Sequence, residues 1–377
     1  MRIAIFSDTF VPQVNGVART VARLVNYLDK NNIPNLVFAP SYGGPDNNKD
    51  GNVFPVPGFN FPLYPECKLA LPMYRAMNRR LAEFKPEVIH LVTPLTIGLC
   101  GLRMAAKTGV PPVASFHTDF PGYLNYYGFG MLEKLSWQFL RWFHNRCAAN
   151  FTPSKETQKL LKINGIRNVG IWGKGVDADL FNPARYSIKA KTMCVPDNKF
   201  SFLYVGRLAP EKSLDVLFKA YRLVKKSHPE AHLVITGDGP IYGKLVREAP
   251  PEVTFTGYKN GLALAEMYAS CDAFVFPSAT ETYGLVILEA LASGLPVLAA
   301  YAGGVKENLI HNYNGLACLP GDPEDLAAKM KMLLADRKMH ATMARNARQF
   351  AEQKSWDSVF EGLLRDYNQV LCCPKSA

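Results

Sequence analysis

The sequence predicts an α/β protein built from two doubly wound parallel sheets. Short runs of β-branched and aromatic residues alternate with amphipathic stretches of helical length, the pattern of successive strand–helix–strand units. A polar stretch at 182–199 interrupts this alternation, which then starts again. The chain has 377 residues and is 48% apolar, so it can bury two hydrophobic cores. We therefore expect two domains of similar architecture.

Five apolar runs of the first half are expected to form buried parallel strands. They are RIAIF, NLVFAP, EVIHLV, PPVASF and ANFTP, with helical patterns between them at 17–31, 73–84, 96–108 and 131–148. The opening MRIAIFSDTF is read as a strand and not as a signal peptide, because Ser7 and Asp8 cut the apolar run short. The sequence contains no run of 18 apolar residues, so no membrane-spanning helix is predicted.

The second half repeats this order with the runs SFLYVG, AHLVITG, VTFTG, AFVFP and PVLAA, each followed by a helical pattern. We expect a first domain at 1–185 and a second at 186–355, with 182–199 as the linker. A last helix at 356–371 is expected to pack back on the first domain. Ligands of open parallel sheets bind beyond the carboxyl ends of the strands. The loops that follow the strands should therefore line a central cleft between the two domains.

Two loops of the first domain carry candidate ligand-binding residues. In QVNGVART, Asn15-Gly16 is expected to form a turn with positive φ before a helix whose amides could face an anion or a sugar. In SFHTDF, His117 and Asp119 fall at the carboxyl end of a strand. The alternatives are that the glycine only makes a turn and that the histidine is structural.

A diphosphate clamp is predicted at the start of the second domain. VGRLAPEKS places Arg207 and Lys212 in a loop that turns into a helix, and two cations beside a helix N-terminus suit a diphosphate. The alternative is a surface ion pair with Glu211, which would stabilise little. TGDGP is expected to support the site as a tight turn. GKGVDA matches a dinucleotide-binding pattern, but the residues after it leave no room for a long helix.

The stretch FVFPSATETYGLVILEA reads as strand, loop and helix, with one carboxylate in the loop and one in the helix. Glu281 lies in the loop, Gly284 begins the helix, and Glu289 sits about two turns inside an apolar run. A carboxylate in such surroundings needs hydrogen-bond donors. Vicinal hydroxyls of a sugar or a ribose would supply them, and the alternative is that Glu289 is solvated or ion-paired.

The net charge and the cysteine content argue against several classes of protein. The net charge of +11 indicates anionic partners, but no block of five like charges supports nucleic-acid binding. Eight cysteines show neither CxxC nor a Cys/His ligand spacing, so no metal site and no disulfide framework are predicted. We expect free thiols in a reducing cytoplasm.

Taken together, these motifs resemble the retaining glycosyltransferases of family 4, which have the GT-B fold. The resemblance rests on Glu281 and Glu289 as E-x7-E, the GR…EKS clamp, GDGP, the early NG loop and SFHTDF, and it spans nearly the whole chain. It implies transfer of a sugar from a nucleotide diphosphate sugar with retention of anomeric configuration. It also implies that no metal or other cofactor is bound.

The resemblance also implies roles for individual residues. Glu281 would hold hydroxyls of the transferred sugar, Glu289 the nucleotide ribose, and Arg207 with Lys212 the departing diphosphate. Three neighbouring backbone amides would add to that contact, and two residues of the first domain would complete the site. The amides are those of Gly284, Leu285 and Val286. In the first domain, His117 would touch the donor sugar or support the positive charge that develops on it. Gly16 would line the diphosphate or acceptor side.

Within the family, the chain is most similar to transferases that act on lipid acceptors, such as phosphatidylinositol mannosyltransferases and diacylglycerol glycosyltransferases. This similarity rests on the stretches FSDTFVPQVNGVARTV, HLVTPLTIGL, SFHTDFPGYLNYYG and IWGKGVD. GDP-mannose is the first expectation for the donor and a UDP-sugar the second. Two alternatives are a nucleotide-sugar epimerase and a catalytically silent nucleotide-sugar-binding scaffold. A nicotinamide oxidoreductase is disfavoured, because the first loop is not rich in glycine.

Two helical stretches of the first domain are candidates for peripheral contact with an anionic membrane on its cytoplasmic face. PMYRAMNRRLAEFK carries Arg75, Arg79, Arg80 and Lys85 among apolar residues. EKLSWQFLRWFHNRC combines Arg141 and Arg146 with aromatic residues. For the second stretch we expect the aromatic side chains to pack in the core, which makes the first the better candidate.

Overall fold

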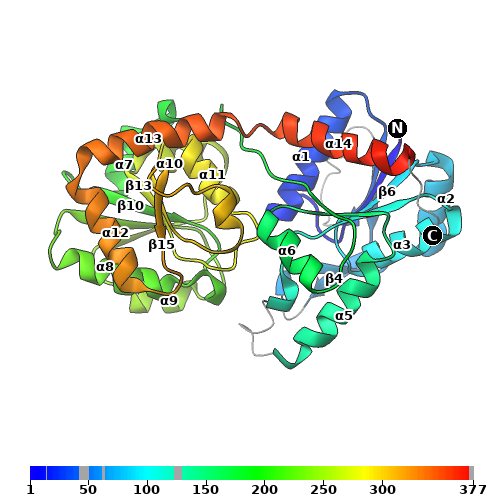
Figure 1. The fold of residues 1–377 in the computed structure, drawn as a ribbon, viewed down its shortest axis with the longest axis horizontal. Helices are drawn as coiled ribbons and strands as arrows, with labels where there is room; N and C mark the ends of the chain where they lie inside the picture. The colour runs from blue at the N-terminus through cyan, green and yellow to red at the C-terminus, as the bar shows by residue number, and fades with distance from the viewer. Residues whose placement is uncertain (14, 42–50, 62–63, 123–129, 373–377) are drawn as a thin grey trace. The chain divides into compact units, whose positions relative to one another are not determined.

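The computed structural model describes residues 1–13, 15–41, 51–61, 64–122 and 130–372, and the chain forms two compact units (Figure 1). Unit 1 comprises Met1–Gly173 and Asp357–Ala377, and unit 2 comprises Lys174–Trp356. Each unit is a parallel sheet with helices in its crossover connections, as the alternation of apolar runs predicts.

In the described part of unit 1, seven parallel strands form one sheet in the order β3-β2-β1-β6-β7-β8-β9. Their bounds are β1 (Ile3–Phe6), β2 (Asn35–Pro40), β3 (Val53–Val56), β6 (Val88–Leu91), β7 (Pro112–Ser115), β8 (Ala149–Thr152) and β9 (Val169–Ile171). A hairpin of β4 (Gly58–Phe61) and β5 (Tyr64–Ala70) adds a second, antiparallel sheet. The helices are α1 (Gly16–Lys30), α2 (Tyr74–Phe84), α3 (Thr96–Thr108), α5 (Glu133–His144), α6 (Lys155–Ile163) and α14 (Trp356–Cys372).

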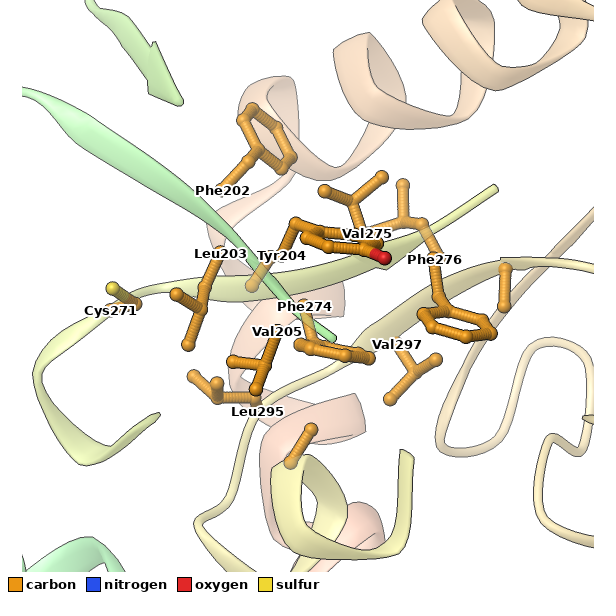
Figure 2. Packing of buried hydrophobic residues seen from close by; sticks show 14 of the residues in the cluster. Phe202, Leu203, Tyr204, Val205, Cys271, Phe274, Val275, Phe276, Leu295 and Val297 are labelled. Carbon is orange, nitrogen blue, oxygen red and sulfur yellow. The ribbon is translucent and has the colours of Figure 1, made fainter. Parts of the chain in front are cut away.

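Unit 2, whose residues 174–356 are all described, has six parallel strands in the order β12-β11-β10-β13-β14-β15. Their bounds are β10 (Phe200–Val205), β11 (Ala231–Thr236), β12 (Val253–Gly257), β13 (Ala273–Phe276), β14 (Val297–Ala300) and β15 (Gly315–Cys318). The helices are α7 (Ile188–Cys194), α8 (Leu214–Lys225), α9 (Tyr242–Glu248), α10 (Gly261–Ser270), α11 (Leu285–Ala292), α12 (Pro323–Ala335) and α13 (Arg337–Glu352). Figure 2 shows side chains of the central strands β10 and β13, such as Leu203 and Phe274 on paired positions of the two strands, packed together in the core.

The ten predicted strands are all present, and the structure adds others that the sequence analysis missed. β9 has only three residues, and β3 contains a proline and is partly exposed, so neither gives a clear apolar run. Both strand orders reverse once, between β1 and β6 in unit 1 and between β10 and β13 in unit 2. Such reversals are where ligands bind in open parallel sheets, because the loops on the two sides diverge.

The unit boundary lies after Gly173, earlier than the predicted boundary at 185, and the stretch 182–199 is not a free linker. The hydroxyl of Tyr283 donates to the carbonyl of Lys174 (2.9 Å), and the ring of Phe181 packs against Tyr268 (5.6 Å). Helix α7 lies within 182–199, and Cys194 at its end is buried in the core of unit 2. These contacts attach the segment to unit 2.

Helix α14 belongs to unit 1 and is held there by a buried polar contact. The Tyr367 hydroxyl lies 2.5 Å from Nδ1 of His90 on β6, and Nε2 of His90 lies 2.5 Å from the hydroxyl of Ser115 on β7. All three side chains are buried. The histidine thus joins the last helix to two central strands.

Tyr367→Phe is expected to lower the free energy of unfolding by about 1–3 kcal/mol, because it leaves a buried imidazole nitrogen without its partner. Chemical denaturation of the full chain would measure the change. Tyr27→Phe is the matched control: its ring also packs on α14, at Phe360 (5.3 Å), but within the described residues its hydroxyl makes no hydrogen bond. Equal stability of Tyr367→Phe and the control would contradict the role given to this contact.

Candidate functional site

The strand reversal of unit 2 brings together the two loops that carry the predicted clamp and the predicted carboxylate. Arg207 follows β10, and Lys212 ends the 3-10 turn Pro210–Lys212 that leads into α8. Glu281 lies in the loop that follows β13. Because β10 and β13 are paired neighbours in a parallel sheet, their following loops meet at the same edge.

Lys212 and Glu281 form an ion pair between Nζ and Oε1, and both side chains are largely buried. Lys212 therefore contacts the carboxylate of the opposite loop in a largely buried pair, which differs from the surface ion pair with Glu211 that was the alternative. Glu211 is itself buried, and its backbone carbonyl accepts hydrogen bonds from the hydroxyls of Ser278 and Thr280 (both 3.2 Å). These bonds fix the loop after β13 to the turn that carries Lys212.

Arg207 is half-buried beside this pair. Burial lowers the pKa of its guanidinium from the ordinary value, and the nearby negative charge of Glu211 opposes that shift. A cation that is partly removed from water gains more from an anionic ligand than one at the open surface. Arg207 and Lys212 can therefore neutralise an anion at the edge of the sheet.

The N-terminus of α11 supplies a third positive feature. Gly284 caps it with φ +78°, a conformation that favours glycine, and the first turn contains no acidic residue. The first amide bonded within the helix is that of Ile287, which donates to the carbonyl of Gly284 (3.0 Å). The amides of Leu285 and Val286 precede it, at the positive pole of the helix.

Glu289 lies further along α11, and a tyrosine that the sequence analysis missed holds it. The hydroxyl of Tyr268, on α10, lies 3.1 Å from Oε2 of Glu289 and 3.2 Å from the carbonyl of Val286. Tyr268 is fully buried, whereas Glu289 is half-buried. The only signal in the sequence is one hydroxyl-bearing ring in the apolar run LALAEMYAS.

Tyr268→Phe is expected to raise the KM for the ligand that Glu289 binds by about 3–10-fold with little change in kcat, because one orienting hydrogen bond contributes about 1 kcal/mol. Steady-state kinetics would separate the two constants. Tyr221→Phe is the control, since it also removes a buried hydroxyl bonded to backbone carbonyls, those of Ala231 and Glu252, but away from this edge. A change in kcat alone would argue against a positioning role.

A glycine pair after β14 also shapes the site and was not singled out from the sequence. The amide of Gly304 donates to the carbonyl of Glu281 (2.6 Å). A Cβ at position 304 would lie 2.2 Å from the carbonyl carbon of Thr282, and one at Gly303, where φ is +52°, would lie 2.4 Å from the carbonyl oxygen of Glu281. Only glycines allow this loop to support the backbone of Glu281.

Gly304→Ala is therefore expected to lower turnover by about 100-fold, because displacing the Glu281 loop by about 1 Å is enough for a loss of that size. Turnover at saturating substrate would measure it. Gly243→Ala is the control: it lies in helix α9, and an added Cβ would approach only the far end of Arg247, at 3.7 Å. Wild-type turnover in Gly304→Ala would show that the close approach is not needed.

The GDGP turn supports the Arg207 loop, as predicted. Gly237 has φ +144°, and a Cβ there would lie 1.9 Å from the carbonyl oxygen of Gly206. The amide of Leu208 donates to the carbonyl of Asp238 (2.9 Å). The GKGVDA stretch forms no helix; a Cβ at Gly175 would lie 2.5 Å from the backbone nitrogen of Trp356. At this stretch the backbone passes close to that of residue 356, and the stretch is not a dinucleotide-binding loop.

The two predicted residues of unit 1 lie at the carboxyl edge of its own sheet. His117 follows β7, and its ring meets Trp172 edge to face with centroids 5.0 Å apart. Gly16 is the first residue of α1. The predicted positive-φ turn at Asn15-Gly16 is wrong at Asn15, which has φ −148° and caps the helix by accepting from the amide of Ala18 (2.8 Å). Asparagine is a favoured N-cap residue, and this use requires extended backbone.

Asp8, at the strand reversal of unit 1, was noted only as the end of an apolar run. It is buried and accepts hydrogen bonds from the Thr93 and Thr96 hydroxyls (2.7 and 2.8 Å) and from the amide of Ile97 (2.8 Å). Burial raises the pKa of this carboxyl, and the hydrogen bonds counteract the rise. Asp8 thus ties the start of α3 to the end of β1.

Among the described residues, no group of three or more His, Cys, Asp or Glu side chains could hold a metal ion. Within the same residues, none of the helices has the length and apolar character to cross a membrane.

Comparison with known protein families identifies the family of this chain. Residues 14–180 match the family described as Glycosyltransferase Family 4, and residues 190–350 match Glycosyl transferases group 1. This chain belongs to glycosyltransferase family 4. It is 37% identical, over 98% of its length and 97% of the relative's, to the GDP-mannose-dependent alpha-mannosyltransferase of Mycobacterium tuberculosis (strain CDC 1551 / Oshkosh). It is 27% identical, over 90% of its length and 80% of the relative's, to the alpha-monoglucosyldiacylglycerol synthase of Streptococcus pneumoniae (strain ATCC BAA-255 / R6).

The fold of this glycosyltransferase is also that of solved structures. Anabaena Alr3699/HepE, in complex with UDP and glucose, superposes with a TM-score of 0.78 over 98% of this chain and all of the other, at 20% identity. The predicted GT-B fold of two Rossmann-like domains is confirmed. The family, with relatives such as the M. tuberculosis mannosyltransferase matched over nearly the full chain, shows an enzyme that uses a nucleotide-sugar donor.

Proposed function

We propose that this glycosyltransferase transfers mannose from GDP-mannose to a lipid-linked acceptor, with retention of configuration and without a metal ion. The observation that carries the proposal is the Lys212–Glu281 pair at the strand reversal of unit 2, with Arg207 and the start of α11 beside it. One edge of one sheet thus offers cations for a diphosphate and a carboxylate for sugar hydroxyls.

In this proposal the residues of unit 2 hold the donor. Arg207, Lys212 and the amides of residues 284–286 bind the diphosphate and stabilise the negative charge that develops as it leaves. This charge neutralisation takes the place of a divalent cation. Glu281 accepts hydrogen bonds from hydroxyls of the transferred sugar, and Glu289, oriented by Tyr268, accepts from the ribose. In unit 1, His117 contacts the sugar and Gly16 lines the diphosphate or acceptor side.

Two considerations support retention without a glycosyl-enzyme intermediate. Glu281 is engaged by a lysine, and Glu211, the other carboxylate of these two loops, is buried, so double displacement through a glycosyl-enzyme intermediate is not proposed. The M. tuberculosis relative is an alpha-mannosyltransferase by name, and the mannose of GDP-mannose is itself alpha-linked. The acceptor hydroxyl would therefore attack from the face that the phosphate leaves, and the phosphate would take the proton of that hydroxyl.

The same mannosyltransferase supports GDP-mannose as the donor. A UDP-sugar is the second candidate, favoured by the name of the S. pneumoniae glucolipid synthase. That name also supports a lipid acceptor and thus peripheral contact with an anionic membrane, on its cytoplasmic face.

Transfer into a lipid fraction tests the proposal. Purified enzyme would be incubated with GDP-[13C]mannose and vesicles containing phosphatidylinositol or diacylglycerol, and the product examined by NMR. We expect labelled mannose in the organic phase with an alpha linkage. A beta linkage would overturn retention, and label only in water-soluble products would overturn the lipid acceptor. Binding of GDP with no turnover of any donor would favour the scaffold alternative.

A further inference from the structure

Helix α5 exposes an apolar stripe, contrary to the prediction that its aromatic residues all pack in the core. Leu135, Phe139 and Trp142 are 62%, 37% and 44% exposed and lie on one face of the helix, four and three residues apart. Met131, in the 3-10 turn just before the helix, continues the stripe and is almost fully exposed. The other face packs inward with Trp137, which stacks on Phe116, and with the buried Leu140 and Phe143.

An open, cationic pocket of about 770 Å³ lies at the end of this stripe. It is formed by the last turn of α5, the end of α6 and the loops that follow them, and none of its lining residues is acidic. Within the described part of the chain its four cations form no ion pair with a carboxylate. They are Arg141, Arg146, Lys162 and Arg167.

Contacts within the pocket fix its two loops and the side chain of Arg146. The side chain of Asn145 donates to the carbonyl of Gly165 (2.9 Å) and accepts from the amide of Arg167 (2.9 Å), which ties the two loops together. The guanidinium of Arg146 lies 4.4 Å from the ring centre of Trp142 and donates to its carbonyl. Mutual repulsion of four such cations would be relieved by an anionic partner.

The other membrane candidate, α2, has a different surface. Its buried residues are Met77 and Leu81, so its apolar face points inward. Arg80 is paired with Glu83 (3.6 Å). The exposed apolar residues Leu71 and Met73 precede the helix and form no stripe along it. The observations therefore favour α5.

We propose that α5 and the pocket bind the surface of an anionic bilayer, with Leu135, Phe139 and Trp142 in the interface and the four cations on lipid phosphates. An apolar stripe beside unneutralised cations is the combination that anionic lipid surfaces bind, whereas a soluble anion would use only the pocket. This inference rests on the proposed lipid acceptor and names the surface that reaches it.

The topology of unit 1 relates this surface to the proposed chemistry. Helix α5 connects the end of β7 to the start of β8, so it runs antiparallel to the strands. Its stripe therefore begins near the edge that carries His117 and ends at the pocket, on the opposite edge. A bilayer along α5 would hold lipid headgroups near the edge of the unit 1 sheet that carries His117.

Vesicle flotation would test the proposal with the full chain, using phosphatidylcholine alone or with phosphatidylglycerol. We expect the wild type to float only with the anionic vesicles. Arg141→Gln/Arg146→Gln/Arg167→Gln should weaken binding roughly 100-fold, since each cation at such a surface contributes about a fivefold factor. Phe139→Ser/Trp142→Ser should also lose binding. A control of equal charge change on unit 2, Lys219→Gln/Lys226→Gln/Lys338→Gln, should bind as the wild type does.

Tryptophan emission gives an independent readout. Anionic vesicles should shift the emission to the blue, and Trp142→Phe should abolish the shift, because Trp142 is the exposed indole of the stripe. Unchanged thermal unfolding and GDP-mannose hydrolysis would show that each variant is folded. Flotation that is unaffected by the stripe and pocket variants would overturn the proposal. It would also be overturned if the only effect of a stripe variant were to convert a dimer of the chain to a monomer. If the wild type hydrolyses GDP-mannose but does not bind vesicles, the membrane surface is refuted and the proposed function is not. If it binds vesicles but does not hydrolyse GDP-mannose, the proposed function is refuted and the membrane surface is not.

Discussion

Replacing Glu281 with alanine is expected to lower sugar transfer by about 100–1000-fold while GDP still binds with near wild-type affinity. The loss is that of an electrostatic contact that strengthens in the transition state. Binding should persist because the replacement removes the carboxylate that holds Lys212 and leaves that cation for the diphosphate. Calorimetric titration of GDP and the transfer rate would measure the two effects.

Glu281→Gln is the matched control for charge. It keeps the shape and one acceptor oxygen, so it should retain more activity than the alanine variant and bind GDP at least as well. Transfer at the wild-type rate in Glu281→Ala would contradict the role assigned to this carboxylate. A parallel loss of GDP affinity would assign it instead to nucleotide binding.

Replacing either cation of the clamp is expected to weaken both binding and transfer. Arg207→Ala or Lys212→Ala should raise the Kd for GDP by about 10–150-fold, the effect of losing a charge-assisted hydrogen bond of about 1.5–3 kcal/mol. Transfer should fall further, since the leaving diphosphate loses the same cation. Titration and steady-state kinetics would show both losses, and Lys219→Ala, an exposed lysine on α8, should show neither.

A double-mutant cycle of Lys212 and Glu281 tests whether the ion pair matters in the unliganded enzyme. Residues in direct contact show coupling energies of about 0.5–3 kcal/mol, whereas independent sites add. Additive losses in the free energy of unfolding would mean that the pair contributes nothing before the donor binds.

The residues proposed to hold the donor could be predicted from sequence to lie together, because one topological rule applies to them. Arg207, Lys212 and Glu281 follow strands, and the carboxyl ends of parallel strands share an edge. The rule needs only strand positions, which the apolar runs give clearly. Glu289 stood out because a carboxylate inside an apolar helix needs a donor.

The remaining features depend on tertiary contacts that no local pattern encodes. Tyr268 reaches Glu289 from another helix, and Gly304 supports Glu281 from another loop. The stretch 182–199 looked like a linker because it is polar, yet it contains α7. The outward face of α5 could not be told from its inward face, because aromatic residues occupy both.

The most direct test is slow donor hydrolysis by the purified protein without an acceptor, across GDP-mannose, UDP-glucose, UDP-galactose, UDP-GlcNAc and ADP-glucose. We predict turnover of GDP-mannose that is lost in Glu281→Ala although GDP still binds. Turnover of GDP-mannose that persists unchanged in Glu281→Ala, or no saturable binding of any of these nucleotide sugars, would contradict the site described for unit 2.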